Sequence, residues 1–321
     1  MMNNLIVSTS PHLHTKTTTH KIMRDVLIAL LPAAAASVVL FGLKALLVIV
    51  TCVGTCILSE YLFNLAAKKK QTVGDLSACV TGLILALSLS TKATVWQCVV
   101  GSAFAIVVVK CMFGGLGCNF ANPAATARIF LITAFASVAG GAPTEFQNVL
   151  TAGATPLAAI KDGAEIADLP SLFNMLIGNR GGAIGEGCAI ALILGGIYLI
   201  ARRVINWQTP VILLATVFLL SLAIEGNATL ALYELLGGGV ILVAFFMATD
   251  YVTTPINKYG RMIFAFGCGL ITVLIRQFGS YPEGVSFALL FMNILSPYIE
   301  KWCSKRPFGK AENKKAGKEG A

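Results

Sequence analysis

Ten apolar segments run through almost the whole of this 321-residue chain, and each is close to the roughly 20 residues that a helix needs to cross a bilayer. Only 12% of the residues are charged, against about 25% in a soluble globular domain. Backbone in lipid must satisfy its own hydrogen bonds, so such segments are expected to be helices. The sequence therefore predicts an all-α polytopic membrane protein, surrounded by the lipid bilayer, with about ten transmembrane helices. These cover residues 25–42, 45–66, 76–91, 94–112, 126–140, 184–201, 209–225, 230–248, 262–279 and 284–300.

The distribution of basic residues predicts the orientation of these helices. If the N-terminus is cytoplasmic and the spans alternate, nineteen of the 24 Lys and Arg residues fall on the cytoplasmic side, as the positive-inside rule requires. We therefore expect a cytoplasmic N-terminal segment (1–24), a membrane domain (25–300) and a basic cytoplasmic tail (301–321). This topology accounts for the net charge of +9, so nucleic acid is not an expected partner. The exceptions are Lys44, Lys92, Lys161, Arg180 and Arg276.

One long polar connection lies on the outer side in this topology. It covers residues 141–183 and contains the stretch "NVLTAGATPLAAIKDGAE" (148–165). Its small and hydroxyl-bearing residues contrast with the apolar segments around it.

Two polar segments follow apolar spans and predict broken helices. "GGLGCNFANPA" (114–124) and "ATDYVTTP" (248–255) contain helix-breaking Gly and Pro residues at membrane depth. Such backbone is tolerated where it is buried in protein or lines a cavity. We expect Asn119, Asn122, Asp250 and Thr253 to hold a polar ligand there; a plain cytoplasmic turn and an interfacial helix cap are the alternatives. The repeated pattern indicates two halves of five spans in an inverted repeat.

Other residue patterns argue against several kinds of site. The nine cysteines are scattered over apolar segments and match neither a disulfide framework nor a ferredoxin-type iron–sulfur spacing. The three histidines all lie near the N-terminus, and we expect no metal site. No nucleotide-binding loop and no hydrolase motif occurs, and no catalytic residue is predicted.

Three acidic residues near predicted helix ends have simple interpretations. Glu60 and Asp75 flank the triple-lysine sequence at 68–70, and we expect them to be solvated or paired with basic residues. Glu283 precedes the last span, where a carboxylate would stabilise the helix N-terminus.

Five motifs together resemble the family of the D subunit of the Rnf electron-transport complex, which is homologous to the B subunit of the Na⁺-pumping NADH:quinone oxidoreductase. The resemblance covers about residues 5 to 303. It implies a subunit, not active alone, of an ion-translocating ferredoxin:NAD oxidoreductase coupled to Na⁺ or H⁺ movement. It further implies the other subunits of that complex as partners and the cytoplasmic (inner) membrane of a bacterium or archaeon as the location. The motifs are "SPH" (10–12), "FGGLGCNFANPA" (113–124), "GATPL" (153–157), "FMATD" (246–250) and "IRQFGSYPEGVSFALLFMN" (275–293).

The resemblance also implies two flavins. Family members carry FMN joined through its phosphate to a threonine hydroxyl, and the motif assigns this role to Thr155, with Gly153 and Ala154 before it. Val149 and Ala152 depart from the family pattern. An extracytoplasmic flavin transferase attaches the FMN, and the predicted topology independently puts Thr155 on that side. A second, noncovalent flavin, riboflavin, is expected within the bundle, with Asn119, Asn122, Asp250 and Thr253 as its candidate contacts.

Two other functions remain open on the residues alone. A bundle with an inverted repeat and broken helices suits a permease or channel for a small solute equally well. A membrane scaffold without a ligand is the third reading. The electron-transfer function depends on the resemblance, because a fold does not define a function by itself.

Overall fold

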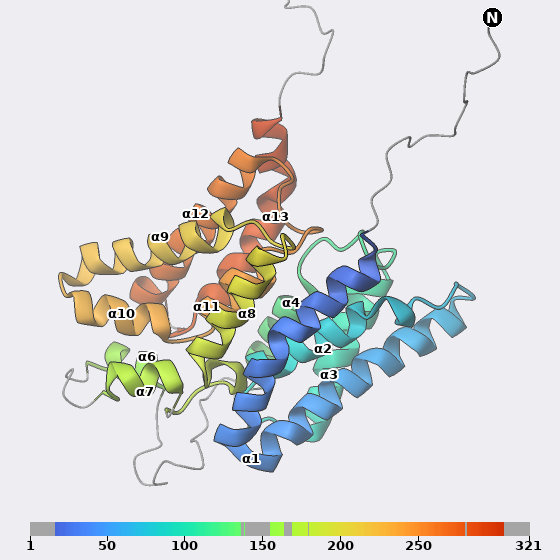
Figure 1. Cartoon of the computed structure of the whole chain (residues 1–321), viewed down its shortest axis with the longest axis horizontal. Coiled ribbons are helices and arrows are strands. Elements are labelled where there is room, and N and C mark those ends of the chain that lie inside the picture. Colours follow the sequence, from blue (N-terminus) through green and yellow to red (C-terminus); the bar gives the residue numbers. More distant parts are fainter. Residues whose placement is uncertain are drawn as a thin grey trace, which may run out of the picture.

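A computed structural model describes residues 17–135, 138, 155–163, 169–178, 180–279 and 281–304. Over these residues the elements are all helical and are joined by connections (Figure 1). The start of α1 and the end of α13 lie on one side of the molecule, and the short helices α6 (Pro156–Lys161) and α7 (Leu172–Ile177) lie toward the opposite side (Figure 1). This arrangement is consistent with the predicted topology. The predicted site residues Gly153 and Ala154, together with Val149 and Ala152, lie outside the described residues.

The first two predicted spans form one helical element, α1 (Thr19–Ala66), which turns back at Gly42. The side chain of Thr18 caps its start by accepting a hydrogen bond from Lys21 N at 3.4 Å. Gly42 has φ 66° and ψ −157°, a conformation that glycine adopts at little cost. The chain therefore reverses at the boundary expected between spans 25–42 and 45–66, and Figure 1 shows the two limbs of α1 diverging from this point.

The next helices are shorter than predicted. α2 (Ser77–Ser88) and α4 (Pro123–Ala134) have 12 residues each, or about 18 Å of helix, against a hydrocarbon core of about 30 Å. Between them, α3 (Val95–Ala103) continues as a π-helix, η2 (Phe104–Cys111). α2 packs closely on α1, since a Cβ atom on Gly82 would lie 2.8 Å from Val53 Cα. Small residues at such contacts are typical of helix packing in membranes.

Over its described residues, the second half of the chain contributes four longer helices and one broken helix. The unbroken ones are α8 (Ala189–Ala201), α9 (Gln208–Glu225), α12 (Lys258–Phe278) and α13 (Val285–Cys303). α12 packs against both α9 and α13, and α8 packs against α1 from the first half. The two halves therefore share one interior.

The predicted span 230–248 is broken. α10 (Ala228–Leu236) ends before three glycines, and α11 (Val240–Leu242) then continues as a second π-helix, η6 (Val243–Met247), bent by 63° from α10. Buried arginines satisfy the free carbonyls at the end of α10. Arg276 donates to Glu234 O (2.5 Å) and Gly237 O (3.2 Å), and Arg180 donates to Leu236 O (2.7 Å). Without these donors, the carbonyls of a helix ending inside the bundle would have no partner.

The structure confirms an all-helical membrane protein but not the number of spans. Among the described residues, α1, α9 and α12 are long and apolar enough to cross a membrane, and the bent pair α10–η6 makes a fourth candidate. α2, α3 with η2, α4 and α8 are shorter apolar helices. Ten spans in an inverted repeat therefore stay a prediction.

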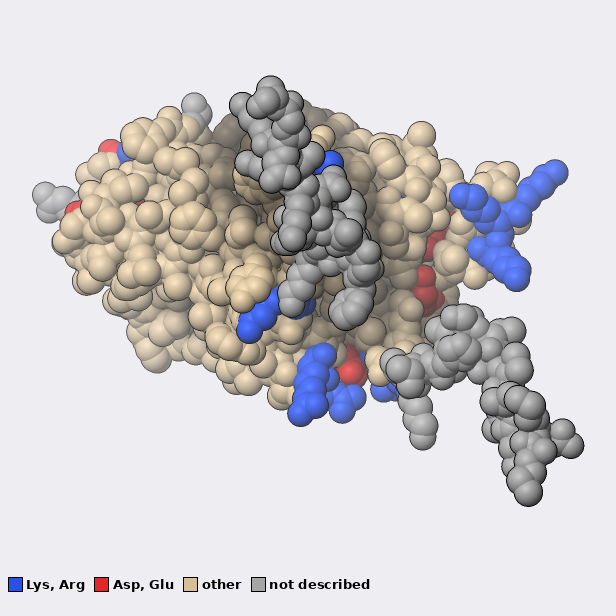
Figure 2. All heavy atoms as spheres, turned by 90° about the horizontal axis from the view of Figure 1, so that it is seen from above, with Lys and Arg blue, Asp and Glu red and all other residues tan. Residues whose placement is uncertain are grey.

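The surface is mostly uncharged. Large apolar side chains are widely exposed, among them Leu43 (78%), Phe278 (80%) and Ile256 (82%). Figure 2 looks onto the side where both described ends lie, and it shows a largely tan surface with separate groups of Lys and Arg and fewer acidic residues. Exposed apolar area of this extent is expected where lipid is the solvent.

Candidate functional site

A cavity of about 780 Å³, counting its open mouth, lies where the two broken segments meet. Its walls come from the start of α1, α2, the start of α4, the end of α8 and η6. The predicted ligand residues Asn119, Asn122 and Asp250 all line it, together with apolar side chains such as Phe245 and Phe246. A mostly apolar cavity of this size with a few convergent polar groups is typical of a small-molecule site.

Asn122 and the backbone of Thr253 are joined through Asn293, which lies in α13. The Asn293 amide donates to Thr253 O (3.2 Å) and accepts from Asn122 N (3.1 Å). The Asn122 side chain in turn accepts from Ala124 N (3.1 Å) and Ala125 N (3.2 Å), which caps α4. These contacts fix the two broken segments to each other.

Asp250 accepts hydrogen bonds from three residues of its own broken segment. Its carboxylate accepts from Thr253 Oγ1 (3.2 Å) and Val252 N (3.3 Å), and its carbonyl accepts from Thr254 Oγ1 (2.5 Å). Burial raises the pKa of Asp250, while the two hydrogen bonds to its carboxylate act in the opposite direction. Thr253 is bonded to Asp250 and is not among the residues that line the cavity, and its contact with a ligand stays a prediction.

Asn119 is the wall residue with spare hydrogen-bonding capacity. Its Oδ1 atom is buried and has no hydrogen-bond partner among the described residues. A buried acceptor without a partner costs about 1–3 kcal/mol. Asn119 is therefore suited to accept a hydrogen bond from a molecule in the cavity.

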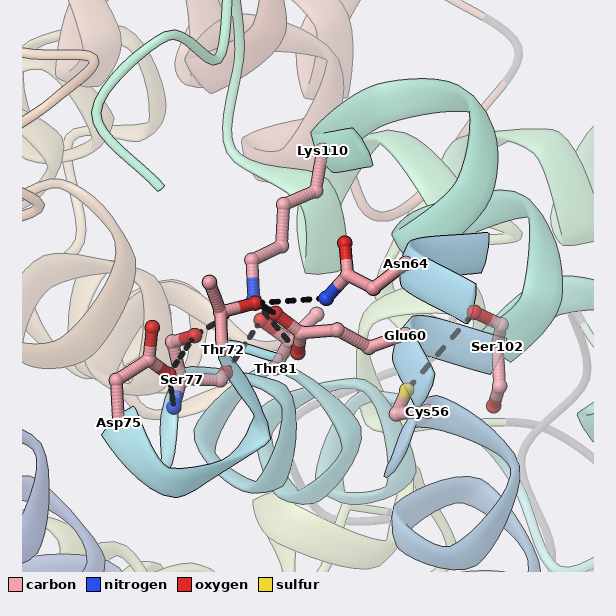
Figure 3. A network of polar contacts seen from close by, with 9 residues as sticks. All are labelled: Cys56, Glu60, Asn64, Thr72, Asp75, Ser77, Thr81, Ser102 and Lys110. Atoms are coloured by element: carbon pink, nitrogen blue, oxygen red, sulfur yellow. Dashed lines mark hydrogen bonds and ion pairs between the residues drawn. The ribbon is translucent and has the colours of Figure 1, made fainter. Parts of the chain in front are cut away.

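A buried ion pair between Lys110 and Glu60 lies beside the cavity, and Figure 3 shows it with its polar neighbours. The Lys110 side chain is 2% exposed and that of Glu60 is 1% exposed. Lys110 Nζ donates to both Glu60 carboxylate oxygens at 2.9 Å and to Ser77 Oγ at 2.6 Å, so all three of its protons are used. Lys110 and Ser77 also line the cavity.

This ion pair belongs to a longer network (Figure 3). Thr72 Oγ1 donates to Glu60 Oε1 (2.6 Å), and Asn64 Nδ2 donates to Thr72 Oγ1 (3.0 Å). On the other side, Ser77 Oγ donates to Asp75 Oδ1 (2.5 Å). The expectation that Glu60 is paired with a basic residue is confirmed, and its partner is buried Lys110.

Thr155 lies at a different place, next to the break in the α10–η6 helix. It is 8% exposed and begins the short helix α6 (Pro156–Lys161), where its Oγ1 accepts from Ala158 N at 3.3 Å. Leu157 packs onto the break, since a Cβ atom on Gly238 would lie 2.9 Å from Leu157 Cδ1. The predicted FMN-bearing residue is thus held close to the broken helix.

A second cavity of about 530 Å³, again counting its mouth, lies along α6. Leu157, Ile160 and Lys161 line one side of it. The other side carries a polar group in which Gln277 Nε2 donates to Glu225 Oε1 (2.9 Å) and Glu234 Oε1 (3.0 Å). This cavity has no residue in common with the first.

Glu283 does not act as the expected helix cap. Instead its carboxylate accepts a hydrogen bond from Arg128, a residue of α4 whose side chain is 3% exposed. Arg128 also donates to Ser286 Oγ (3.2 Å) and lies 3.8 Å from Glu186, in the short 3₁₀-helix η5 (Ile184–Glu186). A buried guanidinium is a stronger partner for this carboxylate than a solvated helix end.

The structure therefore groups part of the predicted set and adds residues that the sequence patterns did not show. Asn119, Asn122 and Asp250 share one cavity, with Thr253 behind it, and Thr155 lies apart from them. Lys110, Ser77 and Asn293 were missed, although Lys110 and Asn293 are each a single polar residue in an apolar stretch, a signal that can mark an interior site.

These features define a helical membrane protein with broken helices, a mostly apolar cavity that carries a few polar groups, and buried ion pairs. A model of the NQR2, RnfD, RnfE family matches residues 6–309. The chain therefore belongs to the NQR2, RnfD, RnfE family, as its sequence motifs predicted.

Three relatives are similar over almost their whole length. The chain is 44% identical to the D subunit of the Na⁺-translocating ferredoxin:NAD⁺ oxidoreductase complex of Acetobacterium woodii, over 98% of each chain. It is 37% identical to the D subunit of the proton-translocating ferredoxin:NAD⁺ oxidoreductase complex of Clostridium ljungdahlii, over 96% of this chain and 97% of that one. It is 36% identical to the D subunit of the ion-translocating oxidoreductase complex of Halorhodospira halophila, over 94% of each.

Proposed function

We propose that the chain is the flavin-carrying membrane subunit of an ion-translocating ferredoxin:NAD⁺ oxidoreductase complex. The observation that carries this proposal is the 44% identity, over 98% of both chains, to a relative named as part of such a complex. The names of the relatives favour electron transfer over the solute-permease alternative. The coupled ion is Na⁺ or H⁺, and the remaining subunits of the complex are the partners.

The proposal includes a noncovalent flavin, riboflavin, in the cavity between the broken segments. The residues present fit such a group, because the unpartnered Asn119 Oδ1 can accept from a ring N–H and the apolar wall suits a planar ring system. Asn122 and Asp250 would shape the polar end of the site. When bound, the flavin would supply the electron-accepting chemistry, and the protein would orient it and exclude water.

The proposal also includes FMN esterified to Thr155, attached by an extracytoplasmic flavin transferase. Two observations support it. Pro156 and Leu157 hold the residue in a fixed position at the start of α6, and a cavity suited to a ring lies along the same helix. At about 1.5 Å per helical residue, Leu157 to Lys161 lie about 3–9 Å from Thr155, which a linker of FMN's kind can span. Esterification would take place at the oxygen that caps α6.

An inverted repeat of five plus five spans is the architecture that we infer for this subunit. The contacts between α4 and α13 support it. Arg128 within α4 bonds to Glu283 at the start of α13, and Asn293 within α13 bonds to Asn122 at the start of α4. Reciprocal contacts of this kind are expected between two antiparallel helices related by a two-fold axis in the membrane plane.

The covalent flavin is tested by expressing the chain together with its flavin transferase. Wild-type protein should give a fluorescent flavin band on a denaturing gel and a mass increase equal to one FMN phosphoester. Thr155→Val should lose both, while Thr151→Val, a matched change four residues earlier, should keep both. A wild-type protein without the band, or a Thr155→Val protein that retains it, contradicts the assignment.

The noncovalent flavin is tested by denaturing purified protein and measuring the flavin released. Asn119→Leu should lower the amount released relative to wild type, because it removes the free acceptor from the cavity wall. Gln71→Leu, an amide-to-leucine change at an exposed position, is the control and should leave it unchanged. Release of no flavin from wild type would remove this part of the proposal.

A further inference from the structure

The network around Lys110 connects the cavity with the lysine-rich end of the bundle. Ser77 lines the cavity and is 4% exposed, and its hydroxyl donates to Asp75 Oδ1 at 2.5 Å. Asp75 is half-buried, and the adjacent Gly74 is exposed. One hydroxyl therefore separates a carboxylate within reach of water from the interior of the cavity.

We propose that Asp75 and Ser77 form a proton relay between water and the molecule bound in the cavity, with Lys110 as a positioning residue. The relay rests on the noncovalent flavin of the proposed function and adds a path for the protons that its reduction requires. Reduction of an isoalloxazine ring consumes protons as well as electrons, and an apolar cavity has no free supply of either.

The local backbone supports a dedicated arrangement. Leu76, between the two relay residues, has φ 65°, a left-handed conformation that is costly for a leucine. Asp75 Oδ1 also accepts from Ser77 N at 2.8 Å, so the carboxylate and the hydroxyl are held by two bonds across this strained residue. Strain of this kind is maintained where the surroundings fix a functional geometry.

Lys110 orients the central hydroxyl. Its ammonium donates to Ser77 Oγ at 2.6 Å, which leaves the hydroxyl proton of Ser77 directed at Asp75 or at the cavity. Glu60 holds the ammonium with two bonds and balances its charge. Lys110 therefore stabilises negative charge that develops on Ser77 Oγ during transfer.

The transfer balances in atoms and charge. The O–H bond of Ser77 breaks and its proton forms a new bond with the acceptor in the cavity, while the O–H bond of protonated Asp75 breaks and re-forms the Ser77 hydroxyl. Asp75 regains a proton from water. The electrons come from the reduced iron–sulfur donor of the complex, a ferredoxin in the proposed function. Oxidation runs the same steps in reverse.

The test follows proton uptake rather than turnover. Full-length protein carrying Thr155→Val, so that only the noncovalent flavin is reduced, is mixed rapidly with reduced methyl viologen in weak buffer containing a pH-indicating dye. Flavin content is measured first. Asp75→Asn and Ser77→Ala should slow proton uptake about tenfold or more with flavin content unchanged. Ser77→Thr, which keeps the hydroxyl, should restore it.

Two matched controls separate the relay from a general effect on the fold. Ser88→Ala removes a buried hydroxyl of the same helix, which donates to Leu85 O at 2.7 Å. Asp25→Asn neutralises a carboxylate that pairs with Arg202 (3.3 Å), away from the network. Both should take up protons at the wild-type rate.

The outcomes are distinguishable. Uptake within twofold of the controls in both Asp75→Asn and Ser77→Ala overturns the relay, even if the flavin is present. If Ser77→Ala does not fold, Asp75→Asn decides, because its side chain is half-buried and its amide keeps the shape of the carboxylate. If the Thr155→Val protein with wild-type Asp75 and Ser77 contains no noncovalent flavin, the proposed second flavin is wrong, and the relay is wrong with it.

Discussion

The buried pair of Lys110 and Glu60 gives a prediction whose size follows from the structure. Lys110→Met leaves the Glu60 carboxylate 1% exposed, with the hydroxyl of Thr72 as its remaining partner. Removing one partner of a buried ion pair costs about 3–5 kcal/mol, because the other charge stays buried. Two lost hydrogen bonds to a charged group, at about 1.5–3 kcal/mol each, give the same order. We therefore expect the free energy of unfolding to fall by about 4 kcal/mol.

The double variant Glu60→Gln/Lys110→Met should be less destabilised than the sum of the single variants. With both charges gone, no uncompensated ion remains, so the coupling free energy should be about 2 kcal/mol or more. Arg202→Met is the control. Arg202 is 54% exposed, so solvent screens its pair with Asp25 (9% exposed, 3.3 Å), and its removal should cost less than the removal of Lys110 from the fully buried pair.

Unfolding in detergent can be followed through the reaction of buried thiols with a fluorescent reagent. Cys52, Cys56 and Cys98 are free and buried, so each becomes reactive when the bundle opens. Midpoints from a denaturant series give the differences between variants. A Lys110→Met protein within about 1 kcal/mol of wild type, or a double variant whose loss equals the sum of the single losses, would refute the reasoning.

Three further predictions concern the broken helices. Gly238 has φ 62°, and the Cβ atom added by Gly238→Ala would lie 2.9 Å from Leu157 Cδ1. We therefore expect the free energy of unfolding to fall by about 1–2 kcal/mol and the covalent flavin band on a gel to weaken. An unchanged band would show that α6 is not held by the break. Asn122→Ala removes the α4 cap and should lower the free energy of unfolding by about 1 kcal/mol in the same thiol assay. Asn122→Asp keeps a capping oxygen and should recover most of this stability. Equal losses in the two variants would exclude capping as the cause. Glu283→Gln should lower the free energy of unfolding by less than Lys110→Met does, because Arg128 keeps Glu186 as a second carboxylate at 3.8 Å. A larger loss of stability would mean that Glu186 does not compensate for the lost charge of Glu283.

Much of the helix pattern could be predicted, because apolar length and glycine are local signals. The turn at Gly42 falls between two predicted spans, and α9 begins one residue before its predicted start and ends at the predicted residue. Helix length in the interior was less predictable. The predicted span 126–140 corresponds to α4, which begins at Pro123 and ends at Ala134, although the apolar composition continues beyond that residue.

Only some of the residues at the candidate cavity could be predicted from the sequence. Asn119, Asn122 and Asp250 stand out because they lie among glycines and prolines that cannot form an ordinary lipid-facing helix. Ser77 begins α2, Lys110 lies in the π-helix η2 and Asn293 lies in α13, and nothing local shows which polar residue faces which. Their pairing depends on how the helices cross, and a single sequence does not contain that information.

The arginines at the broken helix show why single residues can depart from the positive-inside rule while the chain as a whole follows it. Arg180 and Arg276 were assigned to the outer side as exceptions to the positive-inside pattern, yet they are only 2% and 5% exposed. Both donate to carbonyls at the C-terminal end of α10, where the helix dipole favours a positive charge. Their positive charge is therefore explained by the carbonyls at the break, which require donors, and not by the side of the membrane. A basic residue that opposes the topology rule is, in such a chain, a reason to look for a helix that ends inside the bundle.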